Sequence, residues 1–321
     1  MHRLRSAVCA AILMAGATPV HAEDAADAAR EQFSARLAVE QRLQDIGWRL
    51  VSGNARFCEG ARPAIGLQLH DMASYSNPAA VRRLFGLSGD FAVLTSAHGS
   101  PAGEADLPPN TEIAAIDGQD PNAWPAKPNG DWRRVVRAHD LIDAQLAENG
   151  VVELTLSNGE KIRFIANYAC PTRFELGGNG KRALADGSRV ILERGFPGLG
   201  YADDELAAAL AHELAHNLLR HREWLEREGR GQRNIRLTER EADRLMPWLL
   251  ANAGYQPDAA MRFMERWGPR HSGGIFRKRT HDGWDERVEV IATEVAKVNN
   301  SRDQWGAADW RTHFAREVGS E

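Results

Sequence analysis

Helical hydrophobic spacing first occurs near the start of the chain, between residues 24 and 50. This segment is rich in Ala, Arg and Glu, and its larger apolar residues fall roughly on one helical face: Phe33, Leu37, Leu43, Ile46 and Leu50. The pattern predicts a helix that packs against a core. We assign residues 23–55 to this N-terminal helical segment.

Residues 1–22 show a different pattern. A charged start, a short apolar run and small residues before Glu23 are typical of a signal peptide cleaved after Ala22. The alternative is a retained membrane anchor, but the apolar run is shorter than the roughly 20 residues of a span and contains Gly16 and Pro19. We therefore expect an exported protein, periplasmic or extracellular, without a transmembrane span after cleavage.

Between residues 56 and 174 the pattern changes to short β-like runs separated by Gly, Pro and Asn, which predicts a β-rich domain. The runs are 91–97, 111–118, 151–159 and 161–169. A helical pattern precedes the third run. Cys58 and Cys170 flank this domain; in an exported protein the pair suggests one disulfide, and two buried free thiols are the alternative.

The order of these segments resembles a bacterial PDZ domain. The resemblance rests on GSPA at 99–102, the Leu-Pro-Pro turn at 107–109 and the run from Ile113 to Gly118. It implies that residues 84–87 (Leu-Phe-Gly-Leu) form the loop that receives a peptide C-terminus beside a sheet edge. A degenerate module that only packs against its neighbour is the alternative, because Asp106, Asn110 and Thr111 depart from that family's pattern.

Residues 175–321 are mainly helical in pattern. One strand is expected at 188–195, and a helix is expected from about Asp203 to near Gly231, with a buried leucine every fourth residue from Leu206 to Leu218. Further helices are expected around residues 238–245 and from residue 288. The predicted fold class is therefore α+β, a β-rich domain followed by a mainly α-helical one.

Two histidines on the helix from Asp203 point to metal chemistry. His212 and His216 are four residues apart, so a helix places both imidazoles on one face, where they can share an ion. Glu213 lies beside the first ligand and suits a general base acting on a water. Zinc is the expected ion, one per chain, because imidazole and carboxylate ligands with an open position suit it. A His pair exposed on an alanine-rich surface is the alternative.

A third ligand is needed, and Leu219 and Arg222 rule out the longer metzincin motif. Glu239 and Asp243 are four apart on the next expected helix. Glu239 could bind the ion while Asp243 accepts a hydrogen bond from a ligand imidazole. The alternative is a solvated helix face in which both carboxylates pair with Arg240 and Arg244.

The phrases at 203–221, 239–267 and 279–287 resemble metallopeptidase family forty-eight, the gluzincins that include HtpX, the CAAX prenyl proteases and BepA. The resemblance implies that His212, His216 and Glu239 hold zinc, that Glu213 is the general base and that Asp243 supports a ligand. It also implies that His281 approaches the metal or the oxyanion, and that Arg287 contacts substrate or nearby glutamates. Asp282 replaces the family's proline after this histidine. The strand at 188–195 would be an edge strand beside the zinc.

Composition and charge agree with an ordinary folded protein. Hydrophobic residues are 43% and charged residues 26% of the chain, and the formal net charge of −4 argues against a nucleic-acid partner. We expect a zinc-dependent endopeptidase that hydrolyses polypeptides of the cell envelope or misfolded proteins. The alternative is a catalytically silent binding or chaperone-like protein that acts through the PDZ-like domain.

Overall fold

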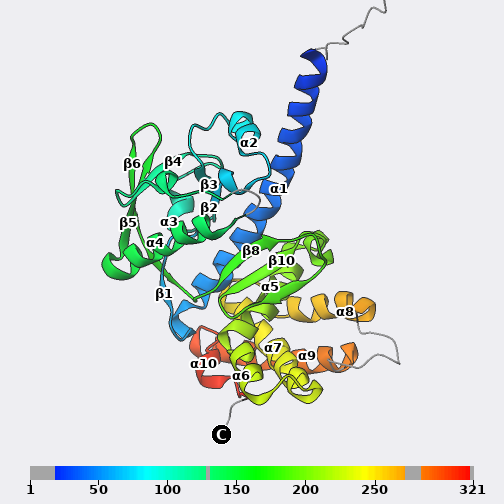
Figure 1. Cartoon of the computed structure of the whole chain (residues 1–321). Coiled ribbons are helices and arrows are strands. Elements are labelled where there is room, and N and C mark those ends of the chain that lie inside the picture. The colour runs from blue at the N-terminus through cyan, green and yellow to red at the C-terminus, as the bar shows by residue number, and fades with distance from the viewer. Residues whose placement is uncertain (1–18, 128–130, 272–282, 319–321) are drawn as a thin grey trace, which may run out of the picture. The chain divides into compact units, whose positions relative to one another are not determined.

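The computed structural model describes residues 19–127, 131–271 and 283–318, and Figure 1 shows the order of its elements. The helices are α1 Pro19–Gly53, α2 Pro78–Phe85, α3 Pro101–Glu104, α4 Arg133–Asn149, α5 Asp203–Leu218, α6 His221–Glu228, α7 Gln232–Asn252, α8 Ala259–His271, α9 Trp284–Trp305 and α10 Trp310–His313. The strands are β1 Arg62–Ala64, β2 Leu67–Asp71, β3 Phe91–Ser96, β4 Ile113–Ile116, β5 Val151–Leu156, β6 Lys161–Ile165, β7 Asn167–Ala169, β8 Arg173–Gly177, β9 Ala183–Ala185 and β10 Arg189–Glu193. The fold is α+β, as expected.

Contacts divide the chain at Arg36, inside helix α1. Before that point the described residues continue the helix, and between Asp27 and Arg36 most side chains are exposed. The signal-peptide prediction concerns residues 1–22, of which 1–18 lie outside the described residues, so it stays a prediction. Among the residues that the structure describes, no helix combines the length and the apolar character that crossing a membrane requires.

The β-rich segment after α1 forms its own hydrophobic core. Strands β2 and β3 pair antiparallel, and β4, β5 and β6 form an antiparallel sheet in that order. Helix α4 places Ala138, Ile142 and Leu146 in this core together with apolar residues of both sheets. The four expected β-like runs are thereby confirmed. The first three are β3, β4 and β5, and the fourth forms both β6 and β7.

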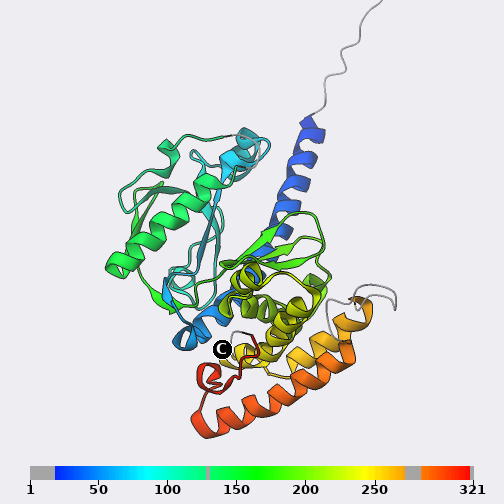
Figure 2. The same cartoon turned by 60° about the horizontal axis from the view of Figure 1, so that its bottom comes forward.

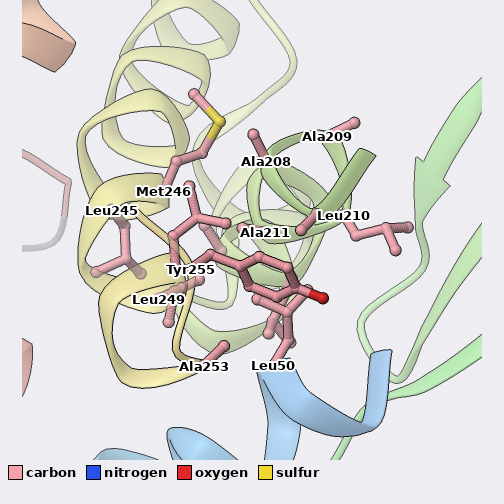
Figure 3. Packing of buried hydrophobic residues seen from close by; sticks show 14 of the residues in the cluster. Leu50, Ala208, Ala209, Leu210, Ala211, Leu245, Met246, Leu249, Ala253 and Tyr255 are labelled. Carbon is pink, nitrogen blue, oxygen red and sulfur yellow. The ribbon is translucent and has the colours of Figure 1, made fainter. Parts of the chain in front are cut away.

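A second, larger core joins the C-terminal half of α1 to the helices that follow β10. Leu43, Ile46 and Leu50 of α1 are fully or almost fully buried in it, which confirms that part of the expected helical face. Figure 3 shows Leu50 in one apolar cluster with alanines of α5 and apolar residues of α7. Because alanine side chains are short, α5 can lie close to its neighbours. Helix α9 runs alongside α7 and α8 (Figure 2).

The strand expected at a sheet edge lies in the middle of its sheet. Strand β10 is the middle strand of its sheet, parallel to β8 on one side and antiparallel to β9 on the other. The expectation that 188–195 is an edge strand was therefore wrong. The two edge strands are β8 and β9, and the three residues of β9, Ala-Leu-Ala, are too few for an alternating pattern to stand out in the sequence.

The helix expected to run from Asp203 to near Gly231 is broken. Helix α5 ends at Leu218, and α6 starts at His221 after Arg220, which adopts a left-handed conformation with φ 55°. This conformation costs a residue other than glycine roughly 1–2 kcal/mol, so glycine usually occupies such a position. Here the residue is an arginine, and the sequence therefore gives no signal of the break. Its consequence is a change in the direction of the chain directly after the histidine pair.

A disulfide joins Cys58 to Cys170, which confirms the expected pairing. Both residues are buried in the larger core, while the segment between them contains the whole smaller core. The bond therefore ties the two ends of the β-rich segment to each other within the larger core.

Loss of this disulfide should destabilise the protein. The bond closes a loop with a sequence separation of 112 residues. Constraining so long a loop in the unfolded chain is worth roughly 2–5 kcal/mol, so the double variant Cys58→Ala, Cys170→Ala should lose about that much free energy of unfolding. Urea unfolding measures the change. Reductant should lower the midpoint of the parent protein and leave that of the double variant in place; an unaffected parent would contradict the assignment.

His139 should make the protein sensitive to mild acid. It is buried on α4 and accepts a hydrogen bond from the backbone N–H of Leu69 at Nε2, and burial, followed by the charge of Arg173, lowers the pKa of His139 to about 3. Below the ordinary pKa of about 6.5 the His139 side chain binds a proton in the unfolded chain but not in the folded protein. The free energy of unfolding therefore decreases as the pH is lowered, by roughly 2 kcal/mol at about pH 5.

The variant His139→Gln keeps an acceptor and removes the titration. Urea unfolding at about pH 7.5 and about pH 5 should show a smaller loss of stability for this variant than for the parent protein. Equal losses in the two proteins would show that His139 is not the source.

Candidate metal centre

Helix α5 supplies two imidazoles to one buried point. The helix starts with Asp203, Asp204 and Glu205, acidic residues that suit the positive end of a helix dipole, and continues with helix-favouring Ala and Leu. One turn separates His212 from His216, and their Nε2 atoms lie 3.3 Å apart. The His212 side chain is 11% exposed and that of His216 is 15% exposed, so the alternative of a surface pair was wrong.

Helix α7 packs against α5 and brings a carboxylate to the same point. Glu239 places Oε2 at 3.3 Å from Nε2 of His212 and Oε1 at 3.6 Å from Nε2 of His216. A tetrahedral ion with bonds of about 2.1 Å separates its ligand atoms by about 3.4 Å. The three side chains therefore have the spacing to hold one metal ion between them.

Asp243 holds the far side of the His212 ring. Its Oδ1 lies 3.0 Å from Nδ1 of His212, and its two oxygens accept hydrogen bonds of 2.6 and 2.7 Å from Arg287 on α9. This contact leaves Nε2 of His212 facing the cluster. Arg287 thus orients an aspartate and also lines the cavity described below, and its expected contact with substrate or glutamates stays a prediction.

The protonation of the two histidines differs because their surroundings differ. Burial opposes a charge on His212, but hydrogen bonds to Asp243 and Glu239 outweigh it and raise the pKa of His212 to about 10. Burial, against which Glu239 acts more weakly, lowers the pKa of His216 to about 3. The carboxylates of Asp243 and Glu239 therefore favour a positive charge at this point, which a bound cation would also supply.

A third histidine, which the spacing of the helical motif does not indicate, lies at this centre. His221 begins α6, is 1% exposed, and has its pKa lowered by burial. Its Nδ1 lies 2.9 Å from Nδ1 of His216, and its Nε2 lies 3.0 Å from Oε2 of Glu241. Burial would raise the pKa of Glu241, but hydrogen bonds from His221 and Arg316 lower it to about 2.

The alternative of a solvated face on the second helix was wrong as well. Asp243 is 1% exposed and pairs with His212 and Arg287. The neighbouring Arg244 is buried and pairs with Glu294 of α9 and Glu317 near the C-terminus. Arg240 and Arg244 therefore pair with Glu317, while Glu239 and Asp243 face the histidines.

A cavity of about 900 Å³ opens onto the centre. Glu213 lines it together with His212, His216 and Glu239, so this carboxylate can reach a molecule bound beside the ion. Strand β9 forms another wall, and aromatic side chains contribute an apolar part: Phe196, Phe263, Trp267 and Trp284. The cavity thus combines a charged floor, a strand edge and apolar walls. His281, expected near the ion, lies outside the described residues.

The loop at 84–87 does not offer free donors to a peptide carboxylate. Phe85 ends α2, and the N–H groups of Gly86 and Leu87 donate to carbonyl groups of that helix. The next two N–H groups, of Ser88 and Gly89, donate to the carboxylate of Glu112 at 3.0 and 2.6 Å, and Ser88 Oγ donates to it at 2.5 Å. An internal carboxylate therefore takes the place that a peptide C-terminus needs, which favours the packing alternative for this module.

Comparison with known proteins gives no family. No protein-family model matches the chain, and no curated protein matches its sequence. The interpretation of the centre therefore rests on its own geometry.

Removal of the carboxylate ligand should weaken metal binding. Glu239→Gln replaces a charged ligand by a neutral amide, so its affinity for Zn²⁺ should fall by roughly 100-fold or more, beyond the effect of removing a supporting contact. Competition with a chromophoric chelator gives the affinity and the stoichiometry, one ion per chain in the parent. Glu265→Gln, at an exposed position of α8, is the matched control and should bind as the parent does. Equal affinities for all three proteins would contradict the ligand assignment.

Proposed function

We propose that this protein is a zinc-dependent endopeptidase of the gluzincin type. One observation carries the proposal: two imidazoles and a carboxylate converge at 3.3–3.6 Å while a second carboxylate, Glu213, lines the adjoining cavity. Structural zinc sites use four protein ligands, whereas catalytic sites use three and leave a position for water or substrate. The donor set of two histidines and one glutamate belongs to the second kind.

The ion fits because both imidazole ligands are held by a contact at Nδ1. Asp243 orients His212, and His221 orients His216, so both rings face the centre through Nε2. Zinc bound there would supply a Lewis acid for the peptide carbonyl and lower the pKa of a water to about 7. Softer or larger ions suit this mixed nitrogen and oxygen set less well.

The chain's own residues would then move the proton. Glu213 follows His212 directly in the sequence, so its carboxylate leaves α5 beside the ligand without occupying the shared ligand position. In this position it takes a proton from the attacking water and delivers it to the leaving amine. Hydrolysis proceeds without a covalent intermediate on the protein.

The walls of the cavity suit an extended polypeptide. Within the described residues, β9 pairs with β10 alone, so its other edge carries backbone groups that a substrate strand can bond. Leu184 in its centre is 37% exposed, and Phe196, Trp267 and Trp284 line the same cavity. Backbone pairing selects extended chains, and the aromatic wall favours apolar side chains next to the scissile bond.

We also propose that the enzyme acts in an oxidising compartment outside the cytoplasm. The disulfide between Cys58 and Cys170 supports this location, because such bonds persist after export and are rare in reducing compartments. Envelope proteins and misfolded exported proteins are the substrates available there. The β-rich module would support the catalytic helices by packing.

Replacement of Glu213 should separate metal binding from catalysis. Glu213→Gln keeps the size of the side chain and removes the base, so cleavage of fluorescent casein should fall by roughly 100- to 10,000-fold while Zn²⁺ stays bound. Glu226→Gln, which changes another carboxylate lining the same cavity, is the matched control and should keep most of the activity.

A zinc chelator distinguishes the peptidase from the rival binding protein. The parent should lose casein cleavage in the chelator and regain it with added Zn²⁺. A parent that binds zinc but never cleaves casein, or a Glu213→Gln variant with full activity, would reject the peptidase and leave a protein that acts by binding.

A further inference from the structure

The break between α5 and α6 brings His221 back to the metal centre. If α5 continued, His221 would point about 140° away from His216, because each residue of a helix turns by about 100°. The left-handed Arg220 redirects the chain, and His221 then places Nδ1 at 2.9 Å from Nδ1 of His216. A conformation that is unfavourable for arginine thus produces the contact.

Hydrogen bonds link His221 through Glu241 to the C-terminal segment. Oε2 of Glu241, which is fully buried, lies 3.0 Å from Nε2 of His221. Its Oε1 accepts hydrogen bonds from the backbone N–H of Val318 at 2.9 Å and from that of Glu317. Arg316 donates to both oxygens through Nε at 3.1 and 3.0 Å. Residues 316–318 therefore fix the side chain that fixes His221.

Arg316 also supports the helix break. Its Nη2 donates to the backbone carbonyl of Leu219 at 3.1 Å, a carbonyl at the end of α5. One side chain near the C-terminus therefore holds both Glu241 and the turn from which His221 projects.

We propose that His221, Glu241 and Arg316 are positioning residues that make His216 a metal ligand through Nε2, and that the C-terminal segment is thereby part of the metal centre. This inference rests on the proposed metal site. It adds residues that the His-Glu-His motif does not contain, and it gives the last described residues of the chain a role in metal affinity.

The directions of the hydrogen bonds follow from the carboxylate. Glu241 only accepts, so Nε2 of His221 carries a proton and its Nδ1 is an acceptor. Nδ1 of His216 must then donate, which leaves the lone pair of its Nε2 directed to the cluster. The carboxylate thus selects the tautomer of a histidine that it does not touch.

The variant Glu241→Gln tests this order of donors. Two backbone N–H groups fix the amide oxygen on the Oε1 side, so the NH₂ group faces His221 and forces its Nε2 to accept. Nδ1 of His221 then carries the proton and opposes a proton on Nδ1 of His216. The affinity for Zn²⁺ should fall by roughly 10- to 100-fold.

Glu294→Gln is the matched control. Glu294 is 2% exposed, pairs with Arg244 and accepts from Trp248 Nε1 at 3.0 Å, so its replacement also neutralises a buried, arginine-paired carboxylate. It lies outside the contacts of His216. Both variants should lose stability, but only Glu241→Gln should lose affinity and change the visible absorption of bound Co²⁺, because that absorption reports the ligand geometry.

A milder pair of variants covers the case in which Glu241→Gln does not fold. The Arg316 side chain is 35% exposed, so Arg316→Gln should fold, and it should weaken Zn²⁺ binding by several-fold, whereas Arg311→Gln at an exposed position of α10 should not. Chelator competition measures the affinities of all four variants and the parent.

Parent-like affinity and parent-like Co²⁺ absorption in Glu241→Gln, or in Arg316→Gln if the former fails to fold, would overturn the positioning role. These measurements involve no peptide hydrolysis. Failure of the casein assay with the parent would therefore reject the proposed peptidase and leave this inference standing.

Discussion

The packing of α5 against α7 is the contact on which the rest of the structure depends. Alanine and leucine side chains on α5 meet the apolar face of α7 in the larger core (Figure 3). This contact sets the histidine pair against Glu239 and Asp243 at distances near 3 Å. A shift of either helix by one residue would turn the ligands away from one another, so the apolar packing determines the polar geometry.

Buried charge limits how such a centre can be built. An unpaired charge in a protein interior costs several kcal/mol, so each charged group near the histidines needs a partner. The structure supplies these partners from other elements: Arg287 of α9 binds Asp243, and Arg316 beyond α10 binds Glu241. Residues far apart in the sequence are therefore required for the short motif on α5 to be buried at all.

The sequence was sufficient for the parts of the site that depend on local periodicity. The spacing of four between His212 and His216, and between Glu239 and Asp243, follows from the helix repeat and predicted which side chains share a face. The role of His221 could not be predicted, because it depends on a helix break at Arg220, where no Gly or Pro occurs. The position of β10 inside its sheet, and not at the edge, likewise depends on pairing with the three-residue β9. Strand neighbours are a property of the fold and leave no periodic signal.

The C-terminal segment links folding to metal binding. Glu241 has no exposed surface, and apart from the bond with His221 the hydrogen bonds to its oxygens come from Arg316, Glu317 and Val318. Arg244, one turn further along α7, similarly binds Glu317. Docking of this segment is therefore needed for α7 to bury its charges, and α7 carries the carboxylate ligand. An ion that binds only the assembled centre stabilises the folded protein by mass action, so the ion and the last described residues of the chain favour the same state.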